Sequence, residues 1–459
     1  MFIWLCVAQL CAAQGSVATA GPQTVNRLQS LTLGNGLRIL VQEQHDNPSL
    51  AVCASYRAGS RDDPQDKAGL AHLVGQLLFQ GSRNLTPDDA YRLISEHGGE
   101  ITNTVSADIT QLCVALPANS LALALWLQSE VMRDLNISNE AFGEQRDLVV
   151  ATLLSSPSER AHDKGRARVR ELAFEDYWPY QHDPLGEAAT LTQLGLSDAL
   201  DFYLTHYSPG NAAISIVGDV NSAQAVALSR QYFETIPTRV VTAAPLVASP
   251  AFRQSSERFD VVTDRHCIVP GVFYGYRIPG FNIDDHLALE LIRAILTTGD
   301  SARLPFSLIP LRTRALAVEG WLTGNQLSDL FGIYVTVAPL SSVDKIHEVL
   351  AAELKRLRFL GPSQGELAKA KAQLRSEILR QVSTPAGLAA ELGRTEVLAL
   401  KAGSLEGQLA LLPNITAQRI RQVVKAYLPD SQRSIVEIYP PSWVQDPTAP
   451  SKRDSDAHK

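Results

Sequence analysis

The sequence lacks an excess of basic residues. Its 459 residues include 41 lysines and arginines against 48 aspartates and glutamates, which gives a formal net charge of -7. Nucleic-acid-binding proteins need clustered positive charge to neutralise phosphates, so the composition argues against a nucleic-acid partner. Charged residues make up only 19% of the chain and hydrophobic ones 45%. A chain of this length, at roughly 100–200 residues per domain, is expected to form at least two domains.

Long hydrophobic runs are also missing after the first residues of the chain. The apolar stretch 1–13 is too short to span a bilayer, and it is followed by small residues that include Ala18 and Ala20. A short apolar core before an Ala-x-Ala pattern is typical of a secretory signal peptide, although the usual basic start is absent. We therefore predict a signal peptide over 1–20, no integral membrane segment after its removal, and a periplasmic or secreted protein.

Cysteine is scarce. Two of the five cysteines fall within the predicted signal peptide, which leaves Cys53, Cys113 and Cys267 in the mature chain. Three cysteines allow at most one disulfide. Cys53 and Cys113 both lie in apolar, strand-like runs, and we favour buried free thiols over a disulfide for this pair.

The rest of the chain alternates strand and helix patterns in a similar order in two halves. Asn35-Gly36 between two apolar runs predicts a β-hairpin at the start of the first half. Strands followed by helices, in duplicate, predict an α+β fold with two similar domains, each an antiparallel sheet with packed helices, in a clamshell arrangement around a chamber. The main expected strands are 37–41, 109–115, 212–217, 272–277, 330–337 and 434–439, and the main expected helices are 68–79, 120–132, 286–297, 343–359 and 366–382.

Domain boundaries follow from composition. The stretch after Pro237 carries Pro245 and Pro250 and few hydrophobic anchors, which is typical of a linker. The last residues are polar and contain proline, which favours disorder. We predict an N-terminal domain over 24–237, a linker over 238–250, a C-terminal domain over 251–442 and a disordered tail over 443–459.

A series of short motifs gives the first indication of a family. They are Leu33-Gly34-Asn35-Gly36-Leu37-Arg38, Tyr56 to Asp62, Gly98 to Asp108, Tyr207 to Ala212, Val217 to Val220, Tyr276 to Gly280 and Ser301 to Leu304. In this order and spacing they resemble the insulinase/pitrilysin-like (mitochondrial-processing-peptidase-like) zinc metallopeptidases. The resemblance extends from about Leu31 to Pro440 and implies two peptidase-like domains.

The catalytic helix of this family carries an inverted zinc motif, H-x-x-E-H. Two histidines four residues apart lie on one helical face and hold Zn²⁺, and the glutamate activates the metal-bound water. The resemblance places His72 at the first ligand, Gly75 at the general base, Gln76 at the second ligand and Thr152 at the third. One imidazole, a neutral amide and a neutral hydroxyl offer no negative charge to Zn²⁺. We therefore predict no catalytic residue and no zinc cofactor in this degenerate member.

Two acid–imidazole pairs elsewhere are weaker candidates for a metal site. Glu96-His97 precedes two glycines, and we expect it to cap the C-terminus of a helix, where a cation is favoured. His182-Asp183 lies in a proline-containing loop, and we expect it to be solvated.

The resemblance also implies a possible role in a partner's active site. In paired members of the family, the subunit without zinc supplies an arginine and a tyrosine that hold the substrate carbonyl. Arg312 matches the arginine, whereas the tyrosine position falls on Val318. A solvated position for Arg312 is an equal alternative. At the substrate edge, Thr102 replaces the usual asparagine and Asn103 follows it, and main-chain pairing with a peptide does not depend on this change.

The sequence thus predicts a non-catalytic (pseudopeptidase) subunit. It would pair with a zinc-bearing homologous subunit in the proteolysis of a peptide or protein substrate. Two alternatives remain: a structural or peptide-binding protein without an active partner, and an active zinc endopeptidase with atypical ligands.

Overall fold

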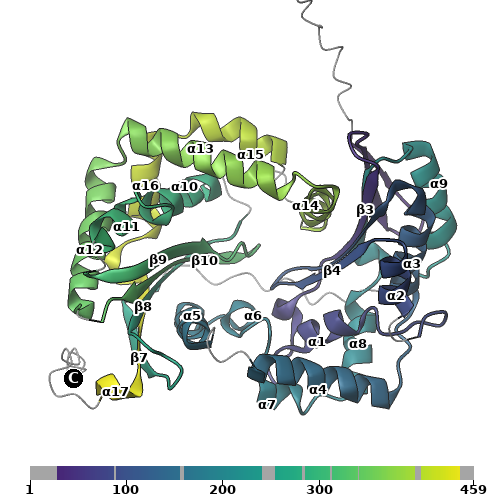
Figure 1. Ribbon diagram of the computed structural model, residues 1–459, viewed down its shortest axis with the longest axis horizontal. Coiled ribbons are helices and arrows are strands. Elements are labelled where there is room, and N and C mark those ends of the chain that lie inside the picture. The colour runs from purple at the N-terminus through teal and green to yellow at the C-terminus, as the bar shows by residue number, and fades with distance from the viewer. Residues whose placement is uncertain are drawn as a thin grey trace, which may run out of the picture.

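The computed structural model describes residues 28–86, 89–155, 160–239, 254–281, 285–310, 313–339, 341–398 and 405–444. Two halves face each other, and each is built on one β-sheet with helices packed against it (Figure 1). This arrangement confirms the prediction of two similar α+β domains. The predicted signal peptide and most of the predicted linker lie outside the described residues. Most of the predicted tail also lies outside them, because the described residues end at residue 444, the last residue of α17 (Pro441–Val444).

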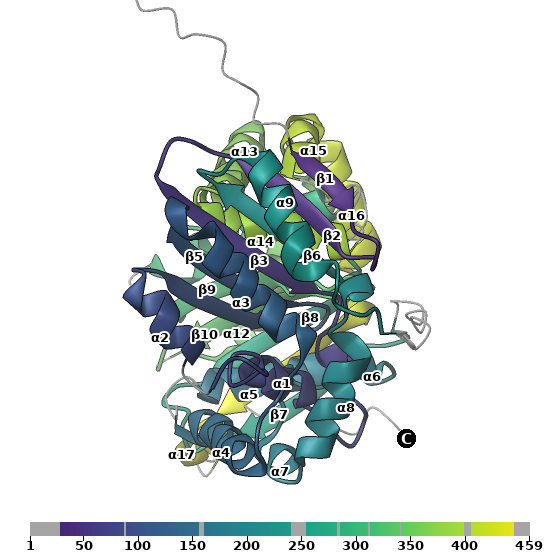
Figure 2. The same cartoon turned by 90° about the vertical axis from the view of Figure 1, so that its right-hand side faces the viewer.

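The first half contains a six-stranded sheet in the order β1-β2-β6-β3-β5-β4. Helices α3 and α9 lie across its outer face (Figure 2). Its strands are β1 (Gln29–Thr32), β2 (Arg38–Glu43), β3 (Ser49–Tyr56), β4 (Glu100–Val105), β5 (Thr110–Pro117) and β6 (Ala212–Gly218). Its helices are α1 (Leu70–Leu77), α2 (Asp89–Glu96), α3 (Leu121–Arg133), α4 (Asn139–Ser155), α5 (Arg160–Ala173), α6 (Trp178–Gln181), α7 (Ala188–Leu191), α8 (Leu196–His206) and α9 (Ser222–Phe233).

The second half contains a five-stranded sheet in the order β7-β11-β8-β10-β9. Its strands are β7 (Arg258–Thr263), β8 (Gly271–Pro279), β9 (Ala315–Leu322), β10 (Ser328–Val337) and β11 (Arg433–Tyr439). Its other helices are α10 (His286–Thr297), α11 (Arg303–Leu308), α12 (Val343–Leu360), α13 (Gln364–Gln381), α14 (Pro385–Val397), α15 (Leu405–Leu411) and α16 (Ala417–Tyr427). The bounds of α10 agree with the apolar periodicity of that segment.

The predicted first hairpin is confirmed. Strands β1 and β2 pair antiparallel, and Gly36 has a φ of +87° in the turn between them. The Asn35 side chain donates hydrogen bonds to the carbonyl oxygens of Phe233 (2.8 Å) and Ile236 (3.0 Å). The turn is therefore held against the end of α9 as well as by its own geometry.

Each sheet contains one parallel pair in addition to the predicted antiparallel ones. The late strand of the first half, β6, is parallel to β2, and the late strand of the second half, β11, is parallel to β7. Both strands come from segments far along the chain and enter the sheet beside an early strand. The residues of β6 are all buried, as expected for an apolar strand inserted between two neighbours.

The two halves are interlocked by an exchange of helices. Helix α5 of the first half packs on β8 and β11, and α14 of the second half packs on β3 and β6 (Figure 1). Both contacts need a glycine. A Cβ atom at Gly165 on α5 would lie 2.1 Å from the Phe273 ring, and one at Gly393 on α14 would lie 2.2 Å from the Ser55 hydroxyl. The halves are thus joined by packed helices and not only by the linker.

The prediction of free thiols at Cys53 and Cys113 is wrong. The two cysteines face each other across β3 and β5, with a Cα–Cα distance of 4.0 Å, and form a disulfide. Strand register decides this outcome, because only directly opposed residues come close enough to be bridged. Cys267 is free and buried, and burial raises the pKa of its thiol to about 11.

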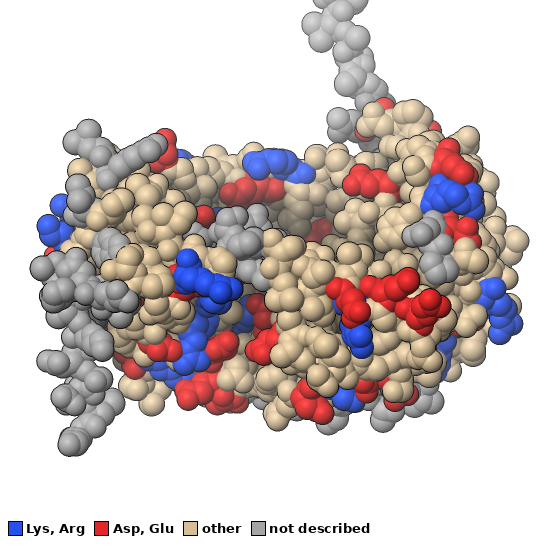
Figure 3. Space-filling view, turned by 60° about the horizontal axis from the view of Figure 1, so that its bottom comes forward, with Lys and Arg blue, Asp and Glu red and all other residues tan. Residues whose placement is uncertain are grey.

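The described surface has no wide area of one charge on the face drawn in Figure 3, where acidic and basic groups lie beside each other. Among the described residues, no helix is long and apolar enough to cross a membrane.

Candidate functional site

Helix α1 carries His72, Gly75 and Gln76, which the sequence analysis predicts to be a degenerate zinc motif, and the start of this helix is fixed by a buried carboxylate. Asp63 accepts hydrogen bonds from the backbone amides of Gly69 and Ala71, both at 2.8 Å. Asp63 also lies 3.5 Å from the Nε2 atom of His182. His182 is only 8% exposed, so the prediction that it lies in a solvated loop is wrong. The ring of Trp178, which stacks on His182 at 4.2 Å, supplies the apolar cover that the sequence did not reveal.

His72 is half-buried on α1. Burial lowers the pKa of its imidazole, and the negative charge of Asp183 opposes this effect only in part. Asp183 itself is held by Arg170 at 2.7 Å. His72 is therefore a neutral side chain near physiological pH.

Strand β4 fills the space beside Gly75, the residue that the sequence analysis predicts at the position of the general base. A Cβ atom at this residue would lie 2.4 Å from the Cγ2 atom of Val105. The Asn103 amide also donates a hydrogen bond to the Gly75 carbonyl oxygen at 2.5 Å. A longer side chain at this position would collide with β4, because the helix and the strand are in direct contact.

The remaining two positions also fit zinc poorly. Gln76 is half-buried on α1. Thr152 is exposed on α4, where its hydroxyl donates to the Leu148 carbonyl oxygen at 2.8 Å. Together with His72, these groups form a donor set without a carboxylate or a thiolate, which does not match a catalytic zinc site. Within the described ranges, no group of three or more His, Cys, Asp or Glu residues could hold a metal ion.

The Gly75 contact predicts the outcome of a single substitution. Gly75→Ala should destabilise the protein by about 1–2 kcal/mol, because the clash with Val105 outweighs the helix propensity gained. Gly143 on α4 is a matched control, since no atom lies within 4 Å of a Cβ built there. Gly143→Ala should stabilise by up to about 1 kcal/mol. Urea unfolding of both variants checks this difference.

A second variant separates the clash from other causes. Val105→Ala in the Gly75→Ala background should recover most of the lost stability, although Val105→Ala alone is destabilising. Additive effects of the two substitutions would contradict direct contact between position 75 and β4.

Strand β4 is the edge strand nearest to these residues. It pairs with β5 on one side and with no other described strand. Thr102 and Thr104 are exposed, whereas Asn103 and Val105 are half-buried against α1. The exposed edge can accept an extended peptide through main-chain hydrogen bonds.

Arg312 and Val318 are the two positions that the sequence analysis compares with the arginine and tyrosine of paired family members. Arg312 lies outside the described residues, so its role remains a prediction. Val318 lies on β9, opposite Val335 of β10, and is half-buried. The predicted cap by His97 is confirmed, because its Nδ1 atom hydrogen-bonds the Leu93 carbonyl oxygen at 2.8 Å at the end of α2.

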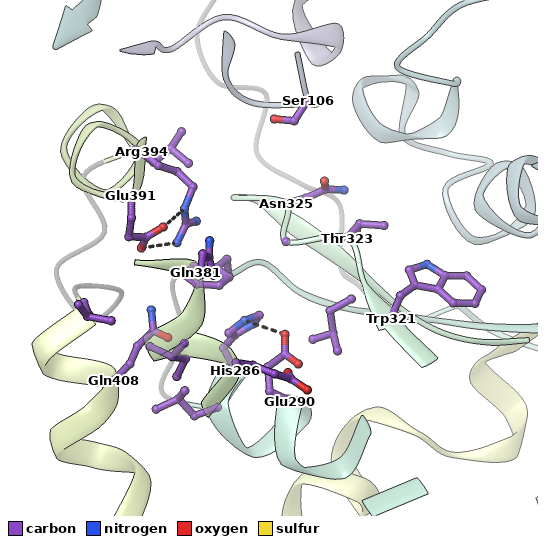
Figure 4. A pocket seen from close by; sticks show the side chains of 18 of the residues that line it. Ser106, His286, Glu290, Trp321, Thr323, Asn325, Gln381, Glu391, Arg394 and Gln408 are labelled. Carbon is purple, nitrogen blue, oxygen red and sulfur yellow. Dashed lines mark hydrogen bonds and ion pairs between the residues drawn. The ribbon is translucent and has the colours of Figure 1, made fainter. Parts of the chain in front are cut away.

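A cavity of about 550 Å³ lies between the halves, and sequence analysis did not identify it. The first half contributes β4 and β5, and the second contributes α10, α13, α14, α15 and β9 (Figure 4). Charged residues on three of these helices, α10, α13 and α14, line it. His286, Glu290 and Arg293 recur at the i, i+4, i+7 spacing of one helical face. From this spacing in the sequence, a charged face of α10 could have been predicted. The other charged residues of the lining are Asp108, Glu377, Glu391 and Arg394.

Two ion-pair groups organise the cavity wall. Arg293 donates to Glu290 and to Glu377, each at 2.7 Å. Arg394 forms two hydrogen bonds with Glu391, at 2.9 and 3.0 Å, and lies over the Phe281 ring at 4.6 Å.

His286 has a strongly perturbed environment. Burial lowers the pKa of its imidazole to about 3, and the nearby Arg394 adds to this effect. The imidazole is therefore neutral at physiological pH. Its Nε2 atom lies 3.8 Å from a Glu290 oxygen, and its Nδ1 atom is buried without a hydrogen-bond partner among the described residues.

Asp108, which lines the cavity, belongs to a buried polar network between the halves. Asp108 accepts from Arg61 at 2.5 Å, from the Tyr180 hydroxyl at 2.7 Å and from the Gln326 backbone amide at 2.8 Å. The Gln326 side chain also accepts from Arg61 at 2.8 Å. This network holds the β9–β10 hairpin tip of the second half against the β4–β5 turn of the first.

The same hairpin contains a buried acid with a raised pKa. Asp329 is fully buried, and desolvation raises its pKa from 3.8 to about 7 although it accepts from the Thr323 hydroxyl and the Leu330 amide. The folded state therefore holds this proton more tightly than the unfolded state. The cost of ionising Asp329 is absent below about pH 4, grows between pH 4 and 7, and is complete above pH 7.

Asp329→Asn removes this titration. Relative to the wild type, the variant should gain stability by a few kcal/mol as the pH rises from about 4.5 to 8. Urea unfolding of both proteins at these two pH values measures the change. A difference in the free energy of unfolding between the variant and the wild type that is the same at both pH values would contradict the raised pKa of Asp329.

Comparison with known proteins agrees with this architecture. The two halves together have the fold of two-domain peptidases. Residues 38–175 match the family described as Insulinase (Peptidase family M16), and residues 193–374 match the domain described as Peptidase M16 inactive domain. The chain belongs to this insulinase-like peptidase family.

Individual relatives extend over nearly the whole chain. The zinc protease PqqE of Helicobacter pylori is 26% identical over 422 residues, which cover 90% of this chain and 93% of that protein. The crystal structure of a protease from Helicobacter pylori is similar with a TM-score of 0.83 at 24% identity, covering 91% and 100% of the two chains. The periplasmic protease PqqL from Escherichia coli gives a TM-score of 0.73 at 18% identity, covering 92% of this chain and 48% of that one.

Proposed function

We propose that the chain is a non-catalytic subunit of an insulinase-like metallopeptidase and pairs with a zinc-bearing homologue in the proteolysis of peptides or proteins. The contact at Gly75 is the main support. A general base at this position needs a carboxylate that reaches metal-bound water, and the Val105 methyl group occupies the start of its path. The neutral side chains of Gln76 and Thr152 add to the argument, because zinc ligands in such sites include carboxylate and imidazole.

The family membership supports a homologous partner. Relatives of similar length carry the name zinc protease, so a zinc-bearing chain of the same fold is the natural companion. The exposed edge of β4, with Thr102 and Asn103, offers a place for an extended peptide that the partner cleaves. Arg312 is the residue that we propose for contact with a substrate carbonyl in the partner's site.

The compartment is proposed on two grounds. The Cys53–Cys113 disulfide favours an oxidising environment, because such bonds are rare where thiols are kept reduced. The apolar start of the chain resembles a signal peptide. We therefore propose a periplasmic or secreted protein, in line with the periplasmic location in the name of PqqL.

An affinity purification of the tagged chain from its native host tests the pairing. The expected result is a stoichiometric co-purifying chain that carries H-x-x-E-H, and peptide hydrolysis by the pair that a chelator abolishes. Recovery of the chain alone, or as a homodimer, would contradict the proposal.

The exposed β4 edge also supports a second candidate function, a peptide-binding protein without an active partner. Peptide binding by the isolated chain, together with the absence of a zinc-bearing partner in the purification, would favour this alternative.

A further inference from the structure

Helix α14 belongs to the second half but covers one face of the first sheet (Figure 1). It makes this contact through small residues. Ala386, Ala389 and Ala390 pack against β3, β5 and β6, and Gly393 meets the Ser55 side chain of β3. A helix that approaches a sheet through such small side chains leaves little spare room. The docked position of α14 therefore depends on the shape of the surface beneath it.

The Cys53–Cys113 disulfide is part of that surface. Both cysteines pack in one cluster with Leu388 and Ala389 of α14. The Sγ atom of Cys53 lies 3.8 Å from the Ala386 carbonyl oxygen. Cys53 is fully buried and Cys113 is 7% exposed. The bond thus lies beneath the first turns of α14.

Two side chains of the first sheet hold the rest of the helix. Gln111 of β5 donates a hydrogen bond to the Ala390 carbonyl oxygen at 2.7 Å. Arg38 of β2 donates to the carbonyl oxygen and the carboxylate of Glu396, at 3.1 and 3.2 Å. Hydrogen bonds of this kind contribute only about 0.5–1.5 kcal/mol each, or about 1.5–3 kcal/mol where a charged group takes part. Docking of α14 therefore also needs the packing over the disulfide.

Reduction of the disulfide changes this packing. Sulfur atoms that are no longer bonded stay at van der Waals separation, so two thiols need room that the alanines above them do not leave. A thiol is only a weak hydrogen-bond donor, so a contact between Cys53 and the Ala386 carbonyl oxygen does not offset this cost. Reduction also removes the covalent tie between β3 and β5 at the place where α14 rests.

The same helix forms one wall of the cavity between the halves. Glu391 and Arg394 of α14 line the cavity, as do Thr104 and Gln111 of the first sheet. Because Gln111 also donates to the α14 backbone, these two walls stay together only while the helix is docked. A change beneath α14 therefore changes the access to the cavity.

We propose that the Cys53–Cys113 disulfide is a redox switch for the docking of α14. The oxidised chain keeps α14 on the first sheet, and reduction by a dithiol releases the helix and opens the cavity on that side. Helix α5 and the network around Asp108 keep the two halves joined in both states. The inference goes beyond the proposed function, because it depends neither on peptide binding nor on a zinc-bearing partner.

The chemical step is thiol–disulfide exchange. A thiolate of the dithiol attacks the Sγ atom of Cys113, the more exposed of the two sulfurs, and the Cys53 sulfur leaves and takes up a proton. The second thiol of the reductant then attacks the mixed disulfide, which frees Cys113 as a thiol and closes the reductant into its own disulfide. The protein gains two electrons and two protons, and the dithiol loses the same number. Since docked α14 covers the bond, reduction and release of the helix are coupled in both directions.

Hydrogen exchange of the full chain, followed by mass spectrometry, tests the switch. The oxidised protein is compared with the protein reduced by dithiothreitol, and alkylation of free thiols confirms the redox state. Helix α3 lies on the other face of the same sheet, so it is an internal control for global unfolding (Figure 2). Cys53→Ala/Cys113→Ala removes the switch, and Cys267→Ala removes only the free cysteine.

Reduction should speed the exchange of the α14 amides by at least about tenfold and that of the α3 amides by less than about twofold. Cys267→Ala should respond like the wild type. The double alanine variant should exchange rapidly in α14 with or without dithiothreitol. Unchanged exchange of α14 in the fully reduced protein, or an equal increase in α14 and α3, overturns the inference.

The reverse coupling gives a second test. Gly393→Ala places a Cβ atom against the Ser55 hydroxyl and should loosen α14. Dithiothreitol should therefore reduce the disulfide about tenfold faster than in the wild type, because the bond is uncovered more often. Gly365→Ala on α13 is the matched control and should keep the wild-type rate, since no atom lies within 4 Å of a Cβ built there.

Arg38→Ala keeps this test decisive if Gly393→Ala fails to fold. It removes the hydrogen bonds to Glu396 at the other end of α14 and leaves the packing over the disulfide intact. Reduction should again be faster than in the wild type. A reduction rate equal to that of the wild type in every folded variant that loosens α14 would overturn the coupling between the helix and the bond.

Discussion

Asp108→Ala should destabilise the protein by about 3–5 kcal/mol. The Asp108 and Arg61 side chains are only 4% and 5% exposed, and removal of the carboxylate leaves the buried Arg61 guanidinium with the Gln326 side chain at 2.8 Å and the more distant Asp62 carboxylate at 3.7 Å. The same substitution deprives the Tyr180 hydroxyl and the Gln326 backbone amide of their acceptor. Because these groups hold the halves together, the hairpin tip of the second half should also become more accessible to proteases. Urea unfolding and limited proteolysis measure the two effects.

Two controls define the cause of this loss. Asp147→Ala removes an acid whose side chain is 69% exposed and paired with Arg146, and it should cost less than about 1 kcal/mol. The double variant Arg61→Met/Asp108→Leu replaces both charges by apolar groups and should recover the part of the loss that comes from the unpaired Arg61 charge, although the Tyr180 hydroxyl and the Gln326 amide still lack their acceptor. A double variant as unstable as Asp108→Ala would show that unpaired charge is not the source of the loss.

Removal of the disulfide is the second change with a large expected effect. The Cys53–Cys113 bond closes a segment with a sequence separation of 60 residues, and the chain-entropy relation gives about 4 kcal/mol for a loop of this length. The Cys53→Ala/Cys113→Ala variant should lose about this amount. The bond also lies under α14, so its loss should loosen the packing of the exchanged helix on β3.

The disulfide prediction has an internal control. A reductant present during unfolding should lower the stability of the wild type and of Cys267→Ala, because both retain the bond. The double alanine variant should not respond. Equal stability of all three proteins under oxidising conditions would contradict a stabilising disulfide.

Local sequence patterns predicted much of the fold. The Asn35-Gly36 hairpin, the closing strand β11 and helix α10 agree with the structure, because turn chemistry and apolar periodicity act over a few residues. The exchange of α5 and α14 was not predicted. Gly165 and Gly393 lie in ordinary helical segments, and only the structure shows which strand each of them contacts. The parallel pairs β2–β6 and β7–β11 were not predicted either, because each joins two strands that lie far apart in the sequence.

The residues of the candidate site could be named from the sequence, but the contacts between them could not, because those contacts join distant segments. The motif identified His72, Gly75 and Gln76 by position, but the contact of Gly75 with Val105 depends on how β4 packs on α1. The pairing of Cys53 with Cys113 needed the register of β3 and β5. The burial of His182 depends on Asp63 of a distant segment as well as on the neighbouring Trp178. Long-range packing thus decided each outcome that the sequence did not reveal.

Zinc binding by the purified chain tests the central claim most directly. The protein is dialysed against micromolar zinc at neutral pH, the bound metal is quantified, and peptide hydrolysis is measured on the same sample. The account predicts no stoichiometric zinc and no hydrolysis that a chelator abolishes, with His72→Ala identical to the wild type in both assays. One zinc per chain that is lost in His72→Ala, together with chelator-sensitive hydrolysis, would contradict it.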